Sequence, residues 1–148
     1  MFEISIIEDD TSACEVLKEY IRRYGRENSL DFEINCYGDA LSFLDLYKHG
    51  SYIIFMDIEL PNMNGIEAAQ RLRENDSTAV LIFVTNMAQF AVKGYEVNAL
   101  DFVVKPLTYP AFCMKIDRAL KVVETLSPHR ITVSVPGKVV RLDVRYLC

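Results

Sequence analysis

Five short apolar segments, separated by stretches with helical periodicity, restrict the fold of this chain more than any other feature. The apolar segments span residues 2–7, 31–37, 52–58, 79–85 and 99–105. After each of them, apolar residues recur every three or four positions, which is typical of a helix with one buried face. The last two of these helices are expected from about Ala88 to Tyr95 and from about Tyr109 to Leu126. Because segment 79–85 is almost entirely apolar, it predicts a central strand covered on both faces. The alternation therefore predicts an α/β fold, a doubly wound five-stranded parallel sheet with helices on both faces.

The composition limits the kind of protein. The chain has 148 residues, of which 51% are hydrophobic, so one well-packed domain with a short appendage is expected. Its net charge of −5 provides no electrostatic basis for holding nucleic acid. The acidic N-terminal stretch does not resemble a secretory signal, and no apolar run reaches the length of a membrane span. These features predict a cytoplasmic protein with no membrane partner.

The cysteines are far apart in the sequence, and only two histidines accompany them. They are Cys14, Cys36, Cys113 and Cys148. Their spacing contains no C-x-x-C pair of the kind that binds zinc. Buried or incidental thiols are therefore expected, in preference to disulfides or a metal centre.

Charged and polar residues stand at the ends of four predicted strands. They are Glu8, Asp9 and Asp10 after the first strand, Asp57 in the third, Thr85 in the fourth and Lys105 in the fifth. In a sheet with the common order 2-1-3-4-5, the first and third strands are neighbours at the point where strand order reverses. Ligands bind outside the carboxyl ends of the strands at this point. Asp9 and Asp57 are therefore expected to lie close together.

Carboxylates held together need a compensating charge. Two unit charges about 4 Å apart repel by about 4 kcal/mol at an effective dielectric of about 20. Lys105 supplies one positive charge, and Mg²⁺, which prefers oxygen ligands, would supply more. Such a site is typical of phosphoryl chemistry, in which Asp57 attacks phosphorus while Lys105 and Mg²⁺ hold the phosphoryl oxygens. Thr85 would then hydrogen-bond the product.

Each of these residues also has a structural interpretation. An aspartate before a turn is often only a turn former, and the Asp10 side chain is expected mainly to cap the first helix. Thr85 could satisfy a loop, and Lys105 could be a solvated charge. It is the joint arrangement at one edge of the sheet that favours a functional site.

The segments "IIEDD", "MDIELPNMNG", "FVTN" and "DFVVKP" resemble, in this order and spacing, the receiver domain of two-component response regulators. The resemblance covers about residues 1–126. It implies that Asp57 accepts a phosphoryl group from a sensor histidine kinase, with Mg²⁺ as cofactor. The chain would then be a phospho-acceptor that assists its own phosphorylation and dephosphorylation, and not an enzyme with turnover.

The resemblance also implies a set of metal ligands. Asp9 and Asp57 would contact Mg²⁺ directly, and the main-chain carbonyl of Glu59 would be a further ligand. Glu8 stands where many receivers have aspartate, and its longer side chain would act through water. The site would thus combine three carboxylates with one main-chain oxygen.

Further positions concern switching. Thr85 matches the switch hydroxyl of receivers, and Lys105 matches the lysine whose bond to Pro106 is expected to be cis. Asn86 follows Thr85 where a small residue is usual, which would narrow access to the site. Phe102 occupies the position of a switch aromatic, so that ring rotation remains available but a hydroxyl-mediated signal does not.

Residues 127–148 have a different pattern. After Ser127 and Pro128, the segment "RITVSVPGKVVRLDVRYLC" alternates apolar residues around a Pro-Gly turn, which predicts two strands. It resembles the opening of a LytTR-type DNA-binding domain, so residues 127–148 are expected to be a linker and the first strands of that domain. The parent protein would regulate transcription, dimerise on activation and bind DNA only through the missing domain. An unrelated β appendage is the alternative.

Two other functions stay open. A phosphatase of the haloacid dehalogenase type also uses a strand-end aspartate and Mg²⁺, although its D-x-D pattern is not matched by Asp57-Ile58-Glu59. A receiver used as a dimerisation scaffold without phosphorylation is the second. A flavodoxin-like FMN protein is disfavoured, because the acidic segment 8–10 would repel phosphate.

Overall fold

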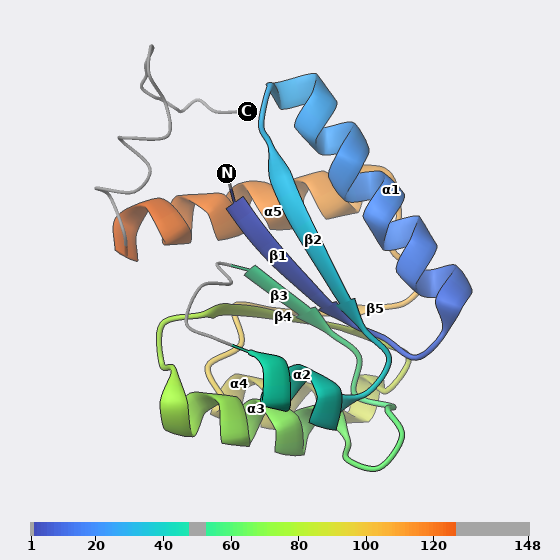
Figure 1. Ribbon diagram of the computed structural model, residues 1–148, viewed down its shortest axis with the longest axis vertical. Coiled ribbons are helices and arrows are strands. Elements are labelled where there is room, and N and C mark those ends of the chain that lie inside the picture. The colour runs from blue at the N-terminus through green and yellow to red at the C-terminus, as the bar shows by residue number, and fades with distance from the viewer. Residues whose placement is uncertain (1, 48–52, 127–148) are drawn as a thin grey trace.

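The computed structural model of the protein describes residues 2–47 and 53–126. The predicted five-stranded parallel sheet is confirmed, with the order β2-β1-β3-β4-β5 (Figure 1). Its strands are β1 (Phe2–Ile7), β2 (Phe32–Tyr37), β3 (Ile53–Met56), β4 (Val80–Thr85) and β5 (Asp101–Val104). The helices are α1 (Thr11–Asn28), α2 (Ala40–Leu46), α3 (Gly65–Asn75), α4 (Ala91–Glu96) and α5 (Tyr109–Leu126). The strands predicted within residues 127–148 lie outside the described residues.

Helices cover both faces of the sheet, as the apolar segments predict. In Figure 1, α1 and α5 lie on one side and α2, α3 and α4 on the other. Side chains of β3 alternate between the two layers: Ile53 and Phe55 pack with α1 and α5, whereas Ile54 and Met56 pack with the other helices. All residues of β4 are buried. Each such aliphatic or aromatic side chain contributes roughly 1.5–3 kcal/mol on burial, so these two layers hold the fold together.

Two predicted elements are shorter in the structure than in the sequence pattern. The helix expected over 88–95 is divided into a 3-10 turn, η1 (Ala88–Phe90), and the short α4. The strand expected over 99–105 begins only at Asp101. Asn98 has a left-handed φ of 59°, and the Ala99 N–H donates to the Gly94 carbonyl at 3.2 Å. The chain therefore completes a turn after α4 before it can enter the sheet.

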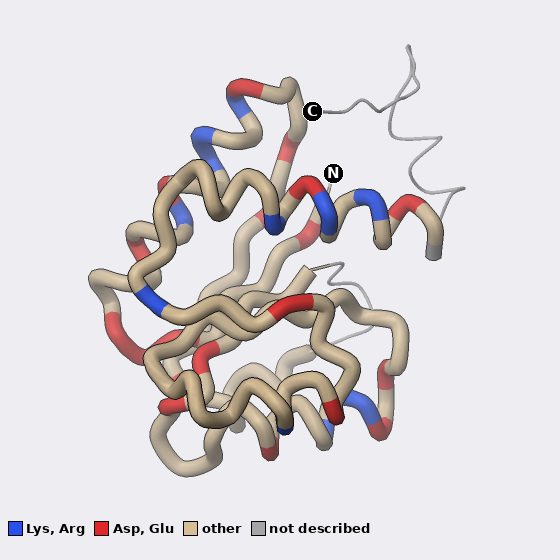
Figure 2. Tube along the Cα trace, turned by 180° about the vertical axis from the view of Figure 1, so that it is seen from behind, with Lys and Arg blue, Asp and Glu red and all other residues tan. Residues whose placement is uncertain are grey.

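The loops at the carboxyl edge of the sheet are held by helix caps. Asp10 caps α1, as predicted, by accepting from the Ser12 N–H at 2.9 Å, and Asn64 caps α3 by accepting from the Glu67 N–H at 2.9 Å. Figure 2 shows acidic residues on the loops at this edge.

Among the described residues, none of the helices combines the length and the apolar character needed to cross a membrane.

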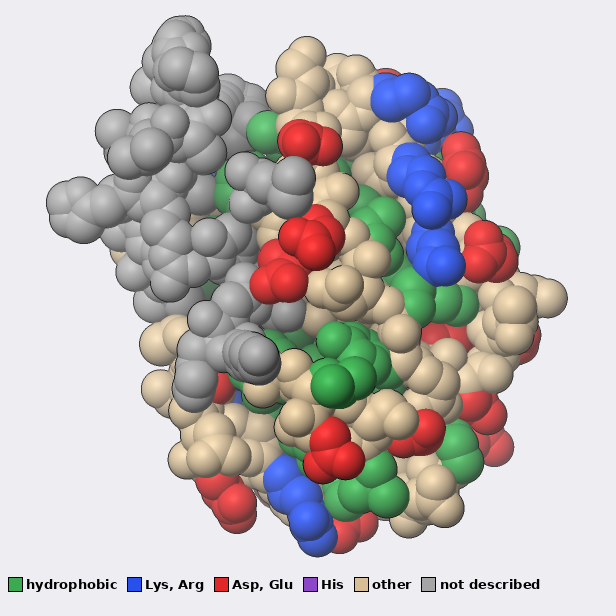
Figure 3. All heavy atoms as spheres, in the orientation of Figure 1, with side chains coloured by type: hydrophobic (Ala, Val, Ile, Leu, Met, Phe, Trp, Pro, Cys, Tyr) green, Lys and Arg blue, Asp and Glu red, His purple; other side chains and the backbone are tan. Residues whose placement is uncertain are grey.

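The outer face of α1 is strongly charged. Figure 3 shows basic side chains in a row along this helix, with acidic side chains beside them. Arg23 pairs with Glu27 at 3.0 Å and Arg26 with Glu19 at 3.5 Å. Exposed pairs of this kind contribute little to stability, typically less than about 1 kcal/mol. The charges therefore keep this face of the helix in water while its other face enters the core.

Candidate functional site

Asp57 lies directly after β3, in a turn that main-chain contacts define. Its N–H donates to the Ile7 carbonyl at 3.0 Å, which extends the pairing of β1 with β3 by one residue. Its Oδ1 accepts from the Glu59 N–H at 3.2 Å. The Gly65 N–H donates to the Ile58 carbonyl at 2.8 Å, and a Cβ at Gly65 would lie 2.2 Å from the Asp57 carbonyl oxygen. Only glycine lets α3 begin this close to the end of β3.

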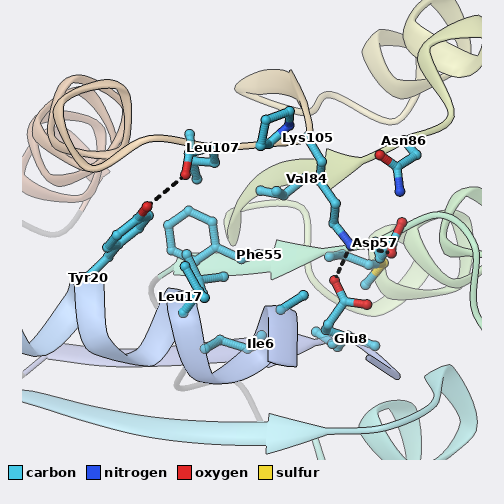
Figure 4. A pocket seen from close by; sticks show the side chains of 15 residues that line it. Ile6, Glu8, Leu17, Tyr20, Phe55, Asp57, Val84, Asn86, Lys105 and Leu107 are labelled. Atoms are coloured by element: carbon cyan, nitrogen blue, oxygen red, sulfur yellow. Dashed lines mark hydrogen bonds and ion pairs between the residues drawn. The ribbon is translucent and has the colours of Figure 1, made fainter. Parts of the chain in front are cut away.

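Lys105 joins two carboxylates from different strands. Its Nζ lies 2.6 Å from Glu8 Oε1 and 3.0 Å from Asp57 Oδ2, and Figure 4 shows the ammonium between the two acids. The side chains are 18% exposed for Lys105, 8% for Glu8 and 6% for Asp57, so water screens these ion pairs only weakly. The peptide bond from Lys105 to Pro106 is cis, as expected.

Asp9 completes an acidic cluster. Glu8, Asp9 and Asp57 each place one carboxylate oxygen within 4.8 Å of the others, which is close enough to hold one metal ion. With all groups ionised, three carboxylates and the Lys105 ammonium leave two uncompensated negative charges. Hard divalent cations prefer such oxygen donors. The donor set and its surplus charge therefore fit a divalent cation.

The surroundings of Asp57 favour its ionised form. Burial by itself raises the pKa of the Asp57 carboxyl, but hydrogen bonds from Thr85 and Lys105 outweigh burial and hold the pKa below its ordinary value. The Glu59 N–H acts in the same direction. Thr85 is fully buried at the end of β4, and its Oγ1 also accepts from the Met87 N–H at 3.2 Å. Asp57 is thus an ionised carboxylate in a fixed position.

Glu8 and Lys105 respond differently to the same burial. Burial raises the pKa of the Glu8 carboxyl above its ordinary value, although Lys105 and the Asp10 N–H donate hydrogen bonds to it. For Lys105, burial favours the neutral amine, but hydrogen bonds to Glu8 and Asp57 outweigh burial and raise its pKa. Lys105 is therefore positively charged. Of the two carboxylates that it contacts, Glu8 has surroundings less favourable to the ionised form than Asp57 has.

A cavity of about 430 Å³ opens beside the acidic cluster. It lies between α1 and the segment after β5, and its wall includes Leu17, Phe55 and Leu107 (Figure 4). Asp57 and Lys105 border the same cavity. The Asp57 side chain, although nearly buried, therefore faces open space from which a reactant can approach.

The structure brings most of the predicted site residues together. Asn86 borders the cavity. Phe102 lies apart from the acidic cluster: its ring packs 5.9 Å from that of Phe83, and a Cβ at Gly94 would lie 2.9 Å from it. The hydrogen bond from the Glu59 N–H to Asp57 was not predicted, because the resemblance implies only a carbonyl role for Glu59. An aspartate before a turn is the pattern that predicts such a bond.

Comparison with known families agrees with this geometry. The family model described as "Response regulator receiver domain" matches residues 4–117, which is most of the chain. The chain therefore belongs to the response regulator receiver domain family and is the receiver domain of a two-component response regulator. This assignment does not favour the phosphatase or the scaffold alternative.

Individual relatives are similar over most of the chain. Sensory transduction protein LytT of Bacillus anthracis is 33% identical over 106 residues, which are 72% of this chain and 42% of the relative. Transcriptional regulatory protein SrrA of Staphylococcus aureus is 28% identical over 134 residues, 86% of this chain and 53% of that protein. The chain thus spans about half the length of these relatives.

A solved structure supports the fold. The response regulatory domain of protein mrkE from Klebsiella pneumoniae superimposes with a TM-score of 0.73 at 24% identity, covering 84% of this chain and 99% of that domain. At this level of identity, the likeness concerns the arrangement of the strands and helices. It confirms the doubly wound sheet derived from the apolar segments.

Proposed function

We propose that Asp57 is the residue at which this receiver domain accepts a phosphoryl group, donated by a phosphohistidine of a sensor kinase. The observation that carries the proposal is the ionised Asp57 carboxylate, fixed between Thr85 and Lys105 and bordering an open cavity. A carboxylate that is charged, oriented and reachable is a competent nucleophile.

The transfer makes one bond and breaks one. A carboxylate oxygen of Asp57 attacks phosphorus in line, the bond from phosphorus to the kinase histidine breaks, and the electron pair stays on the ring nitrogen. Lys105, which already contacts Asp57, would then pair with a phosphoryl oxygen. Thr85 would donate its hydroxyl to another. The product is an acyl phosphate whose phosphoryl group carries a charge of about −1.5 to −2, in place of the single negative charge of the Asp57 carboxylate.

Mg²⁺ is the proposed cofactor. Asp9, Asp57 and the main-chain carbonyl of Glu59 would hold it directly. Both oxygens of Glu8 already accept hydrogen bonds, from Lys105 and from the Asp10 N–H, which favours a role for Glu8 through water. When bound, the ion neutralises charge on the phosphoryl oxygens during transfer.

The signal is proposed to pass to an output domain. Phosphorylation would favour a homodimer, with Phe102 packed between α4 and β4 as the switch aromatic. Residues 127–148 would be a linker and the first strands of a LytTR-type DNA-binding domain, so that the whole protein regulates transcription in the cytoplasm. The names of the relatives LytT and SrrA support an output of this kind.

Intact-mass measurement tests the acceptor. Incubation of the chain with acetyl phosphate and Mg²⁺ should add one phosphoryl group, and chelation of the metal should prevent it. Asp57→Asn should abolish the addition, whereas Asp45→Asn, an exposed site on α2, should leave it intact. An unmodified wild-type chain, or a labelled Asp57→Asn variant, would refute the proposal.

A further inference from the structure

Cys14 and Cys36 bring two thiols together from neighbouring elements. Cys14 lies in the first turn of α1, and Cys36 lies near the end of β2, which runs beside α1 (Figure 1). Their Sγ atoms are 3.2 Å apart, although the residues are 22 positions apart in the sequence. A disulfide bond is about 2.04 Å long. The two sulfurs therefore need to approach by only about 1.2 Å to become bonded.

The two thiols have different surroundings. Cys36 is exposed, whereas Cys14 is 8% exposed and burial raises its pKa to about 12. An accessible thiol meets a dissolved oxidant before a buried one does. Cys36 is thus suited to react first, and Cys14 second.

We propose that Cys14 and Cys36 form a reversible disulfide when the protein meets a hydroperoxide. The Cys36 thiolate attacks one oxygen of hydrogen peroxide, the O–O bond breaks, and a sulfenic acid and hydroxide form. The Cys14 sulfur then displaces the hydroxyl group from the Cys36 sulfur, and the Cys14 proton leaves with it as water. In sum, two thiols and one peroxide give one disulfide and two waters.

The bond would restrain the loop between β1 and α1, which carries Glu8 and Asp9 of the acidic cluster. On one side of this loop, the Glu8 N–H donates to the carbonyl of Tyr37, next to Cys36, at 3.0 Å. On the other side, the Cys14 N–H donates to the Asp10 carbonyl at 3.0 Å. A disulfide would therefore join the two segments that already hold the loop at its ends. This inference does not depend on the proposed phosphorylation.

Oxidation of the full chain tests the pairing. After treatment with hydrogen peroxide and alkylation of remaining thiols, mass spectrometry should show a loss of two hydrogen atoms and a linked pair of peptides containing Cys14 and Cys36. A dithiol reductant should reverse both. Cys36→Ser, an exposed substitution, should abolish the linkage, while Cys113→Ser on α5 should leave it intact. A stable oxide on Cys36, or linkage only between two chains, would overturn the proposal.

Hydrogen exchange tests separately whether the disulfide restrains the loop. In the disulfide form, the amides of residues 8–14 should exchange more slowly than in the reduced form, while those of α5 should be unchanged. The same peroxide treatment of Cys36→Ser should not slow exchange in residues 8–14. Equal exchange in the oxidised and reduced wild type would show that the bond does not restrain the loop and would overturn that part of the inference.

Discussion

Asp57 and Asp76 are both buried aspartates, but they lie at opposite edges of the sheet and in different surroundings. Asp57 follows β3 and Asp76 precedes β4, and they are 5% and 8% exposed. Asp76 Oδ1 accepts from the N–H groups of Thr78 and Ala79, at 2.9 and 3.2 Å, and Oδ2 accepts from the Tyr47 hydroxyl. No second carboxylate is part of these contacts.

The difference lies in how the charge is satisfied. Donors of the surrounding chain, with the Arg73 guanidinium close by, meet the charge of Asp76. Around Asp57, a single ammonium faces the three carboxylates of the acidic cluster. Hydrogen bonds to a charged group stabilise a fold by about 1.5–3 kcal/mol each, but a surplus of like charge does not. Burial of a carboxylate therefore does not by itself indicate function, and the uncompensated charge around Asp57 is what points to a ligand.

The largest effect on the free energy of unfolding is expected for Asp76, whose carboxylate accepts several hydrogen bonds. Asp76→Ala should lower the free energy of unfolding by about 3 kcal/mol, because Tyr47, Thr78 and Ala79 lose this acceptor. Urea unfolding measures the change. Asp45→Ala, at an exposed position, is the control and should stay within about 0.5 kcal/mol of the wild type. If Asp76→Ala lowered the free energy of unfolding no more than Asp45→Ala does, the hydrogen bonds of Asp76 would not stabilise the fold as inferred.

Mg²⁺ should stabilise the protein by binding only at the edge of the sheet where Asp57 lies. At a free concentration ten times its dissociation constant, the ion should raise the free energy of unfolding of the wild type by about 1.4 kcal/mol. Asp9→Asn should remove most of this gain, whereas Asp76→Asn should retain it. Unfolding in urea with and without the ion gives both numbers. An unchanged gain in Asp9→Asn would place the ion elsewhere.

The smallest expected effect is the loss, at acidic pH, of the stability that Asp76 provides. Burial alone raises the pKa of Asp76, but hydrogen bonds from Tyr47 and Thr78 hold it below 3.8. A carboxyl whose pKa is lowered by folding stabilises the fold above its unfolded pKa, and this stabilisation is lost as the pH falls through the folded pKa. The advantage of the wild type over Asp76→Asn, about 1 kcal/mol at pH 7, should therefore shrink below about pH 4. An advantage that is constant between pH 7 and pH 3 would contradict this.

The sheet could be predicted because its signals are local. The almost entirely apolar segment 79–85 became the interior strand β4, and the pattern over 109–126 became α5 with the same ends. The region after α4 was predicted less well, since the left-handed turn at Asn98 delays β5 until Asp101. Turn geometry depends on single residues and on contacts such as that between Gly94 and Phe102, which leave no periodic pattern.

Strand periodicity and strand direction can be read from the residue pattern, and they place the polar residues that end four strands at one edge of a parallel sheet. Which of these residues touch depends on the folded chain. Lys105 contacts Glu8 across 97 positions of the chain, and the Cys14 and Cys36 thiols meet although their spacing matches no motif. Such contacts depend on side-chain direction and on the packing of α1 against the sheet, and residue patterns along the chain record neither.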